Sequence, residues 1–297
     1  MPSAGILLCL TSAAAFGAMG IFGKLAYEQG ATVGTLLAVR FVLAAVLFWL
    51  FMVSSGRTRD LRALGRRDVM IGLALGAVGY SAQAGGYFAA LQRLDASLLS
   101  MLVYTFPAIV TVTAIALGRE RASRRTAIAL AFASTGLALV LAGSAAGALD
   151  PLGTALGLAA AVVYSVYILA SEGVAVRMGP LPLSTLVCTG AAITLTLAGV
   201  AGGDLDPGPV SAAGFGWLAG LAVVSTVGAV GLFFAGLRYV GPTIASILAT
   251  AEPLVTVLLA FLVFGEMLGP VQVVGGSLVL AAVLVLQAHP IKERSHD

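Results

Sequence analysis

The sequence predicts an all-α integral membrane protein with ten transmembrane helices, arranged as two inverted five-helix repeats. Three observations support this fold class. The chain is 60% hydrophobic and only 10% charged, with a mean hydropathy of +1.05, whereas about a quarter of the residues are charged in soluble domains. Its two halves match each other in sequence, and its positive charges fall in alternate connections.

Ten apolar stretches are long enough to cross a bilayer, which takes about 20 residues of helix. They run over about 4–26, 33–54, 69–91, 95–117, 126–145, 152–171, 182–200, 212–236, 243–264 and 270–288. The strands of a membrane barrel are about 10 residues long and alternate in polarity. Since the stretches here are twice as long and apolar on all sides, we expect helices.

The connections between the spans alternate in charge. The even-numbered connections hold most of the cations, namely Arg57, Arg59, Arg62, Arg66, Arg67, Arg119, Arg121, Arg124, Arg125, Arg177 and Arg238, and the tail adds Lys292 and Arg294. The odd-numbered connections are acidic or nearly neutral. Because cytoplasmic loops are enriched in Lys and Arg, both termini are predicted to be cytoplasmic.

The stretch from Tyr87 to Glu120 is repeated in the second half, over 232–266. With a shift of 146 residues and no gap, Pro107 falls on Pro253 and Glu120 falls on Glu266. Five spans per half is an odd number, so the second half enters the membrane from the opposite side. We therefore predict inverted repeats over residues 1–146 and 147–297, an architecture that binds solutes near the midplane.

Polar aromatic side chains form stripes on three of the predicted spans. Tyr80, Gln83 and Tyr87 are spaced i, i+3, i+7 and share one helix face. The sixth span repeats this pattern with Tyr164 and Tyr167, and the fourth span contributes Tyr104. Such residues either pack between helices or line a cavity. For several on one face we favour a cavity that binds the substrate.

Glu252 lies about ten residues from the inner end of its span, so it is about 15 Å deep at the rise of an α-helix. An ionisable residue at this depth needs a partner, a water-filled cavity or a function. One interpretation is a carboxylate that binds a proton or a cation for energy coupling. The other is a structural carboxylate that bonds to backbone near a kink or pairs with Lys24 or Arg40.

Arg40 and two prolines complete the candidate residues. Arg40 lies inside the second span, where it either snorkels outward or faces a cavity and binds a substrate carboxylate through two hydrogen bonds. Pro107 and Pro253 hold mirror positions in the fourth and ninth spans. A proline in a span frees a carbonyl one turn back. The pair marks either the hinges of a moving gate or fixed kinks.

Several function classes lack their signatures. The sequence contains no HExxH, CxxC, nucleophile elbow or Walker phosphate loop. We therefore expect no catalytic residues, no metal and no cofactor. The net charge of +3 comes from short connections without interleaved aromatic residues, which argues against nucleic-acid binding and indicates contact with the lipid bilayer. Cys9 and Cys188 both lie in apolar segments and are expected to be buried thiols.

The repeated motifs resemble those of the EamA family of the drug/metabolite transporter superfamily. They are Glu252-Pro253 followed by Gly265-Glu266, and Pro107 followed by Gly118-Arg119-Glu120. The resemblance implies a carrier of the bacterial inner membrane that exports amino acids or other small metabolites. It also implies a central cavity lined by the first, third, fourth, sixth, eighth and ninth spans. One departure is Phe16-Gly17, where members often have Trp-Gly.

These features together predict a secondary transporter that works by alternating access. The aromatic residues favour an uncharged or zwitterionic small molecule, because a phosphate would require several cations. Proton exchange through Glu252 and simple facilitated passage are both open, as are a monomeric and a homodimeric state. Two alternatives remain: an intramembrane enzyme acting on a lipid with Glu252 and Arg40 as its working pair, and a scaffold that transports nothing.

Overall fold

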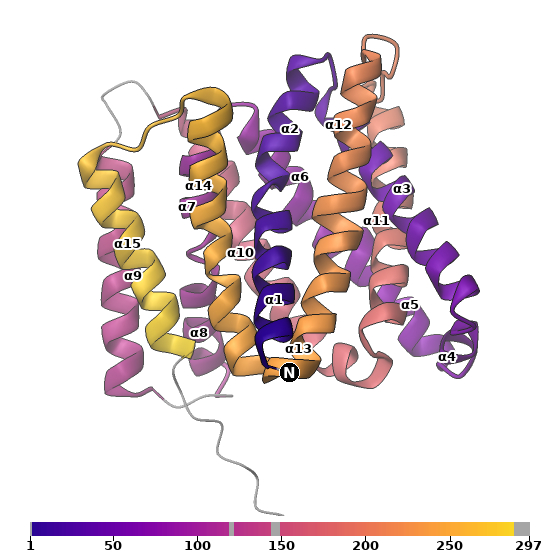
Figure 1. Ribbon diagram of the computed structural model, residues 1–297, viewed down its shortest axis with the longest axis horizontal. Helices are drawn as coiled ribbons and strands as arrows, with labels where there is room; N and C mark the ends of the chain where they lie inside the picture. Colours follow the sequence, from indigo (N-terminus) through magenta and orange to yellow (C-terminus); the bar gives the residue numbers. More distant parts are fainter. Residues whose placement is uncertain (1, 119–121, 144–148, 288–297) are drawn as a thin grey trace, which may run out of the picture.

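The computed structural model describes residues 2–118, 122–143 and 149–287, and over these residues the chain forms helices and no strand (Figure 1). The first half contains α1 (Pro2–Gly17), α2 (Met19–Glu28), α3 (Val33–Ser54), α4 (Thr58–Arg62), α5 (Arg66–Ala74), the π-helix η1 (Leu75–Tyr80), α6 (Ser81–Leu91), α7 (Ala96–Val103), α8 (Phe106–Ala116) and α9 (Arg124–Ala142). The second half contains α10 (Pro151–Met178), α11 (Pro180–Gly202), α12 (Ala212–Ala222), the π-helix η2 (Val223–Gly228), α13 (Ala229–Ala249), α14 (Ala251–Phe264) and α15 (Pro270–Gln287).

Nine helical stretches within these described ranges are long and apolar enough to cross a membrane. They are Ser3–Glu28, Val33–Ser54, Arg66–Leu91, Ala96–Ala116, Arg124–Ala142, Pro151–Ser171, Pro180–Gly202, Ala212–Gly241 and Ile247–Phe264. A tenth apolar helix, Pro270–Leu286, is shorter. These bounds follow the ten predicted spans closely. The fifth helix ends at Ala142 rather than near 145, with Gly143 directly after it.

Some of the residues on which predictions were made lie outside the described ranges. They are Arg119, Glu120 and Arg121, the boundary between the predicted repeats at 146, and the basic tail with Lys292 and Arg294.

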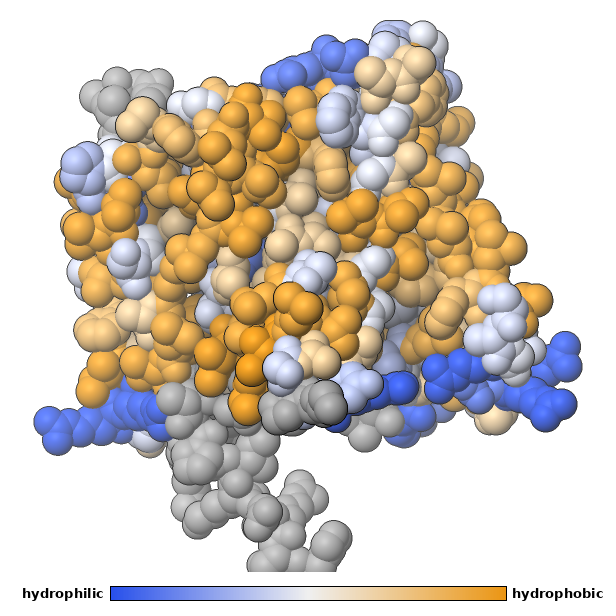
Figure 2. Space-filling model, in the orientation of Figure 1, coloured by the Kyte–Doolittle hydropathy of each residue, from blue (hydrophilic) through white to orange (hydrophobic). Residues whose placement is uncertain are grey.

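The helices stand side by side and present two ends, which contacts between distant connections identify. Lys24 pairs with Asp95 and Arg93 pairs with Asp150, which brings odd-numbered connections together at one end, called here the acidic end. Arg177 pairs with Asp68 at the opposite, basic end. The start of α1 and the end of α15 share one edge of the molecule (Figure 1). Figure 2 shows that hydrophilic residues gather at the two ends of the molecule and that the face between these ends is mostly apolar.

Helices at equivalent positions in the two halves pack together or pack in equivalent ways. The spans that begin at Arg66 and Ala212 are separated by 146 residues (212 minus 66), and so are those that begin at Arg124 and Pro270 (270 minus 124). Helix α9 packs against α15, α3 packs against α11, and the pairs α1–α13 and α6–α10 also pack. This order supports the predicted duplication. Ten crossings in two inverted repeats remain our interpretation of it.

The predicted spans 95–117 and 243–264, the fourth and the ninth, are each broken next to a proline. Helix α7 ends at Val103, and α8 restarts at Phe106 with Pro107 in its first turn. Helix α13 ends at Ala249, and Pro253 lies in the first turn of α14. A first-turn proline costs little, because the N–H it lacks has no partner within the helix. Both prolines therefore begin new half-helices instead of bending continuous ones.

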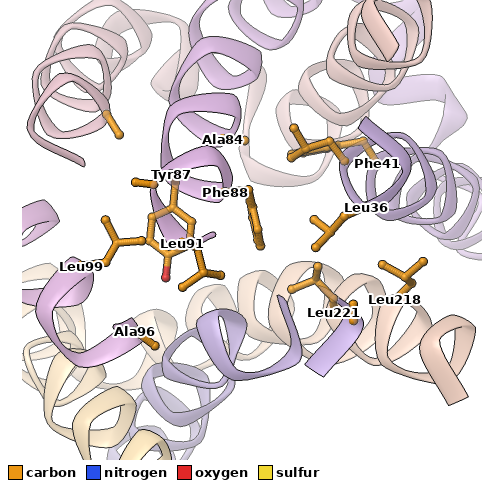
Figure 3. Packing of buried hydrophobic residues seen from close by; sticks show 14 of the residues in the cluster. Leu36, Phe41, Ala84, Tyr87, Phe88, Leu91, Ala96, Leu99, Leu218 and Leu221 are labelled. Carbon is orange, nitrogen blue, oxygen red and sulfur yellow. The ribbon is translucent and has the colours of Figure 1, made fainter. Parts of the chain in front are cut away.

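Figure 3 shows part of the main hydrophobic core, where side chains of α3, α6 and α12 meet. Phe88 of α6 is fully buried among side chains that include Leu36 and Phe41 of α3 and Leu221 of α12. Close approach of α2 to α6 depends on Gly23, where an added Cβ would lie 2.7 Å from Phe88 Cε1. Phe88 also lines the cavity described next, so this packing forms one wall of that cavity.

Candidate functional site

A cavity of about 460 Å³ lies between helices of both halves. Its lining includes most of the predicted site residues, namely Arg40, Tyr80, Gln83, Tyr87, Tyr104, Tyr164, Tyr167, Glu252 and Pro253. Pro107 does not line the cavity, although its neighbour Phe106 does. The tyrosine stripes therefore face a common space.

Four of the tyrosines and Phe106 form a continuous aromatic wall that runs from η1 through α10 and α8 to the end of α7. The ring centroids of Tyr80 and Tyr167 are 5.6 Å apart, and Tyr167 stacks on Tyr164 at 6.3 Å with an interplanar angle of 14°. Phe106 contacts Tyr164 at 4.7 Å and Tyr104 at 5.7 Å, edge to face in both cases. These are the offset and T-shaped geometries that aromatic rings prefer. The i, i+3 spacing on α10 places Tyr164 and Tyr167 on the same wall.

Arg40 is 2% exposed and lines the cavity instead of snorkelling to the membrane surface. Its Nε donates a hydrogen bond of 3.0 Å to Thr226 Oγ1. Its guanidinium carbon lies 4.9 Å from the Phe41 ring centroid and 5.3 Å from that of Phe88. Among the described residues, no carboxylate forms an ion pair with it. A buried cation without a fixed counter-charge is costly and indicates a functional role.

Thr226 holds this arginine and was not singled out from the sequence. It lies on η2, and its hydroxyl donates a 3.0 Å hydrogen bond to the carbonyl of Leu221, five residues back. Ser81 does the same after η1, donating 2.8 Å to the carbonyl of Gly76. Single π-turns of this kind are frequent at functional sites. The sequence signal that could have identified these turns is a hydroxyl residue in the middle of each of two matching apolar spans, Ser81 in the third and Thr226 in the eighth.

Glu252 lines the cavity from the first turn of α14. The predicted pairing with Lys24 or Arg40 is wrong, because Lys24 bonds to Glu266 and Asp95 while Arg40 bonds to Thr226. The carboxylate of Glu252 forms no ion pair with any described residue. Arg40 and Glu252 line the same cavity but form no ion pair with each other.

Hydrogen bonds tie the broken helices to their neighbours around the cavity. The hydroxyl of Tyr104 donates to the carbonyl of Ala249 at 2.7 Å, which joins the end of α7 to the end of α13. Thr256 Oγ1 donates to the carbonyl of Gly17 at 3.0 Å, where α1 ends. Freed carbonyls at membrane depth need such partners. The cavity thus sits where three interrupted spans meet.

The cavity extends toward the basic end. Its lining continues to Ala175, Pro180, Leu183 and Ser184, which flank the turn between α10 and α11 beside Arg177. Toward the acidic end, the lining stops at Tyr87, Phe88 and Ser100. The two native thiols, Cys9 and Cys188, are buried and free, and both line the wall.

Comparison with known proteins identifies relatives of this chain. An uncharacterized transporter of Archaeoglobus fulgidus is 30% identical over 229 residues, which cover 76% of this chain and 78% of that protein. The uncharacterized transporter YcbK of Bacillus subtilis is 26% identical over 280 residues, covering 92% of this chain and 89% of YcbK. A solved crystal structure with 19% identity shares the fold, with a TM-score of 0.65 over 96% of both chains.

The sequence profile of the EamA-like transporter family matches residues 3–142 and 151–287. The two matched segments cover almost all of the described residues and include every wall of the cavity. On this match the chain belongs to the EamA-like transporter family and is a multi-pass membrane transporter.

Proposed function

We propose that this transporter is a secondary carrier that moves a small uncharged or zwitterionic metabolite, such as an amino acid, by alternating access. The observation that carries the proposal is the aromatic cavity between the two halves, with Arg40 and Glu252 as its only charged lining residues among those described. A single guanidinium matches one carboxylate, whereas a phosphate or polyanion would call for several cations. The tyrosine faces offer packing for an apolar body and cation–π contact for an ammonium group.

The balance of charge supports a solute with little net charge. One arginine and one carboxyl group give the lining little net charge. Transferring an ion into such a site without an opposite charge is costly. A zwitterion would bring its carboxylate to Arg40 and its ammonium to Glu252 or the aromatic rings.

The proposed direction of transport is export, which the extension of the cavity toward the basic end supports. By the positive-inside rule the basic end is cytoplasmic, so both termini are cytoplasmic. The cavity reaches that end beside Pro180 and Ser184, so the solute loads from the cytoplasm and is exported across the bacterial inner membrane. Movement of the half-helices on either side of the breaks at Tyr104 and Thr250 would expose it to the other side.

Two experiments in sequence test this proposal. A thermal-shift screen of the purified protein against a panel of metabolites should find stabilisation by an uncharged or zwitterionic solute, because a ligand of the folded state raises its stability. Proteoliposomes should then exchange that solute, labelled on one side, with unlabelled solute on the other. Conversion of a labelled lipid by the same preparation, without any solute exchange, would favour an enzyme.

A further inference from the structure

Glu266 lies directly after α14 and fastens the second half of the chain to the first. Its Oε1 lies 2.5 Å from Lys24 Nζ. The same oxygen accepts a hydrogen bond from the backbone N–H of Ala96, at 3.3 Å. Its Oε2 accepts two more, of 3.0 Å each, from the N–H and the hydroxyl of Ser97. One carboxylate therefore binds a cation and caps the N-terminus of α7, where negative charge is favoured.

Lys24 is held in place by more than this one contact. Its ammonium group lies 3.5 Å from Asp95 and 5.5 Å from the centroid of the Phe264 ring. Lys24 and Asp95 belong to the first half, whereas Phe264 and Glu266 belong to the second. The side chain of Glu266 is only 6% exposed and that of Lys24 is 21% exposed. Shielding of this kind makes a charged hydrogen-bonded pair stronger than a pair on the surface.

This contact borders one of two neighbouring hollows in the molecule. On one side is a vestibule of about 650 Å³ at the acidic end, lined by Lys24, Tyr27, Glu28, Leu91, Gln92, Asp95, Phe264 and Glu266. On the other side is the cavity, which reaches Tyr87 and Phe88. Phe88 lines the cavity and Leu91 lines the vestibule, and the two residues are one turn apart on α6, so buried side chains of α6 lie between the two spaces. Figure 3 shows both residues in the apolar cluster.

Helix α2 is in close contact with α6 between the two hollows. The hydroxyl of Tyr27 donates to the carbonyl of Phe88 at 2.8 Å, which holds α2 against α6. An added Cβ at Gly20 would lie 3.1 Å from the Tyr87 hydroxyl. The cavity lining ends at Tyr87 and Phe88 on this side and extends toward the basic end. Helices α2, α7 and α14 pack against one another at the acidic side of these residues.

We propose that Lys24, Glu266 and the N-terminus of α7 form the gate that closes the solute cavity toward the acidic end. The inference rests on the proposed alternating access. In the alternate state the Glu266 carboxylate leaves α7 and Lys24, and α14 separates from α2. Water in the vestibule then hydrates the parted charges, which makes the opening reversible, since hydration offsets much of the lost ion-pair energy.

The gate can be tested without any solute. A single cysteine replaces Val103, a partly exposed wall residue of the cavity, in a chain that also carries Cys9→Ser and Cys188→Ser. Spheroplasts and inverted vesicles present opposite faces to a membrane-impermeant thiol reagent. Glu266→Gln and Lys24→Met break the proposed gate. Glu28→Gln is the matched control, because it removes a carboxylate from the same vestibule but leaves the contact between Lys24 and Glu266 intact.

In the protein that carries the cysteine at 103 and keeps Lys24 and Glu266, labelling should be faster from the basic face than from the acidic face. Glu266→Gln and Lys24→Met should each raise the labelling rate from the acidic face about tenfold, the effect of a shift of about 1.4 kcal/mol between two states. Glu28→Gln should leave the rate unchanged. Equal rates in all variants, with thermal stability retained, would overturn the gate. Loss of solute exchange with intact gating would instead count against the proposed solute.

Discussion

The Nε of Arg40 donates a hydrogen bond of 3.0 Å to the hydroxyl of Thr226, across the interface between the two halves of the chain. The same hydroxyl gives its own proton to the carbonyl of Leu221, so its lone pairs remain directed at the guanidinium. The π-turn that contains Thr226 therefore fixes the direction in which a buried cation faces the cavity. This one contact links local helix geometry to the charge that a solute meets.

Replacing Thr226 by Val should destabilise the protein and weaken binding of solutes that carry a carboxylate. The substitution keeps the shape but leaves a charged donor buried without its acceptor, which costs about 1 to 3 kcal/mol. Thr226→Ser retains the hydroxyl and should behave like the wild type. Thermal unfolding and solute titration check this pair of variants. If Val and Ser gave equal affinities, Thr226 would have no role in positioning Arg40.

Replacing Glu252 by Gln tests whether solute exchange is coupled to the movement of protons. The carboxylate lines the cavity and has no ion-pair partner among the described residues, so it is free to bind a proton or an ammonium group. If it couples transport to protons, the variant should exchange solute at a rate independent of pH, whereas the wild type responds to a pH gradient. Exchange that is independent of pH in both proteins would remove the coupling role.

The strength of the Lys24–Glu266 contact should depend on pH in a defined direction. Burial raises the pKa of Glu266, but the hydrogen bonds from Lys24 and Ser97 outweigh burial and hold the pKa below its usual value. A group with a lowered pKa contributes its full stabilisation above its ordinary value, about 4.3, and loses it as the pH falls through the lowered one. Asp95 and Glu28 are the other carboxylates around Lys24 in the vestibule.

Labelling of the cysteine at 103 from the acidic face measures this dependence. Because a thiol reacts as its thiolate, every labelling rate rises with pH, so the rate of the Val103→Cys protein is divided by that of the same protein carrying Glu266→Gln at each pH. We expect this ratio to stay constant and low between about pH 6 and 8 and to rise toward one only as the pH falls below the ordinary Glu pKa. A ratio that rose with increasing pH would contradict the sign of the effect.

Replacing Pro253 by Ala should change transport more than stability. Pro253 lies in the first turn of α14, where it costs far less than the roughly 3 kcal/mol of a proline inside a helix. Alanine restores an N–H that can extend the helix back toward α13 and close the break. We expect unfolding within about 1 kcal/mol of wild type and slower solute exchange. Normal exchange would show that the break is a fixed kink, and Pro107→Ala gives the matching test in the first half.

Much of the fold follows from the sequence because membrane spans depend on local composition. The predicted spans agree with the helices. The alternation of loop charge also agrees with the structure, because Arg93–Asp150 joins connections at the acidic end and Arg177–Asp68 joins residues at the basic end. The i, i+3, i+7 spacing of Tyr80, Gln83 and Tyr87 predicted that they share one face, and all three line the cavity. Helical periodicity reports which residues share a face.

The remaining features depend on contacts that a local pattern does not encode. Lys24 was one of two possible partners suggested for Glu252, yet its partner Glu266 is 242 residues away from it in the sequence. The π-turns before Ser81 and Thr226 arise where a hydroxyl takes a carbonyl five residues back. Hydropathy is the same for an α-turn and a π-turn, so neither feature has a compositional signature.

Solute exchange by a variant that carries both Tyr80→Ala and Tyr104→Ala tests most directly whether this cavity is the transport site. Tyr80 and Tyr104 stand at opposite ends of the aromatic wall, so the double variant shortens the wall at both ends. In proteoliposomes with matched protein content, exchange should fall at least tenfold, while a Tyr80→Phe and Tyr104→Phe variant should retain most of it. Wild-type exchange by the alanine variant would contradict the assignment of this cavity.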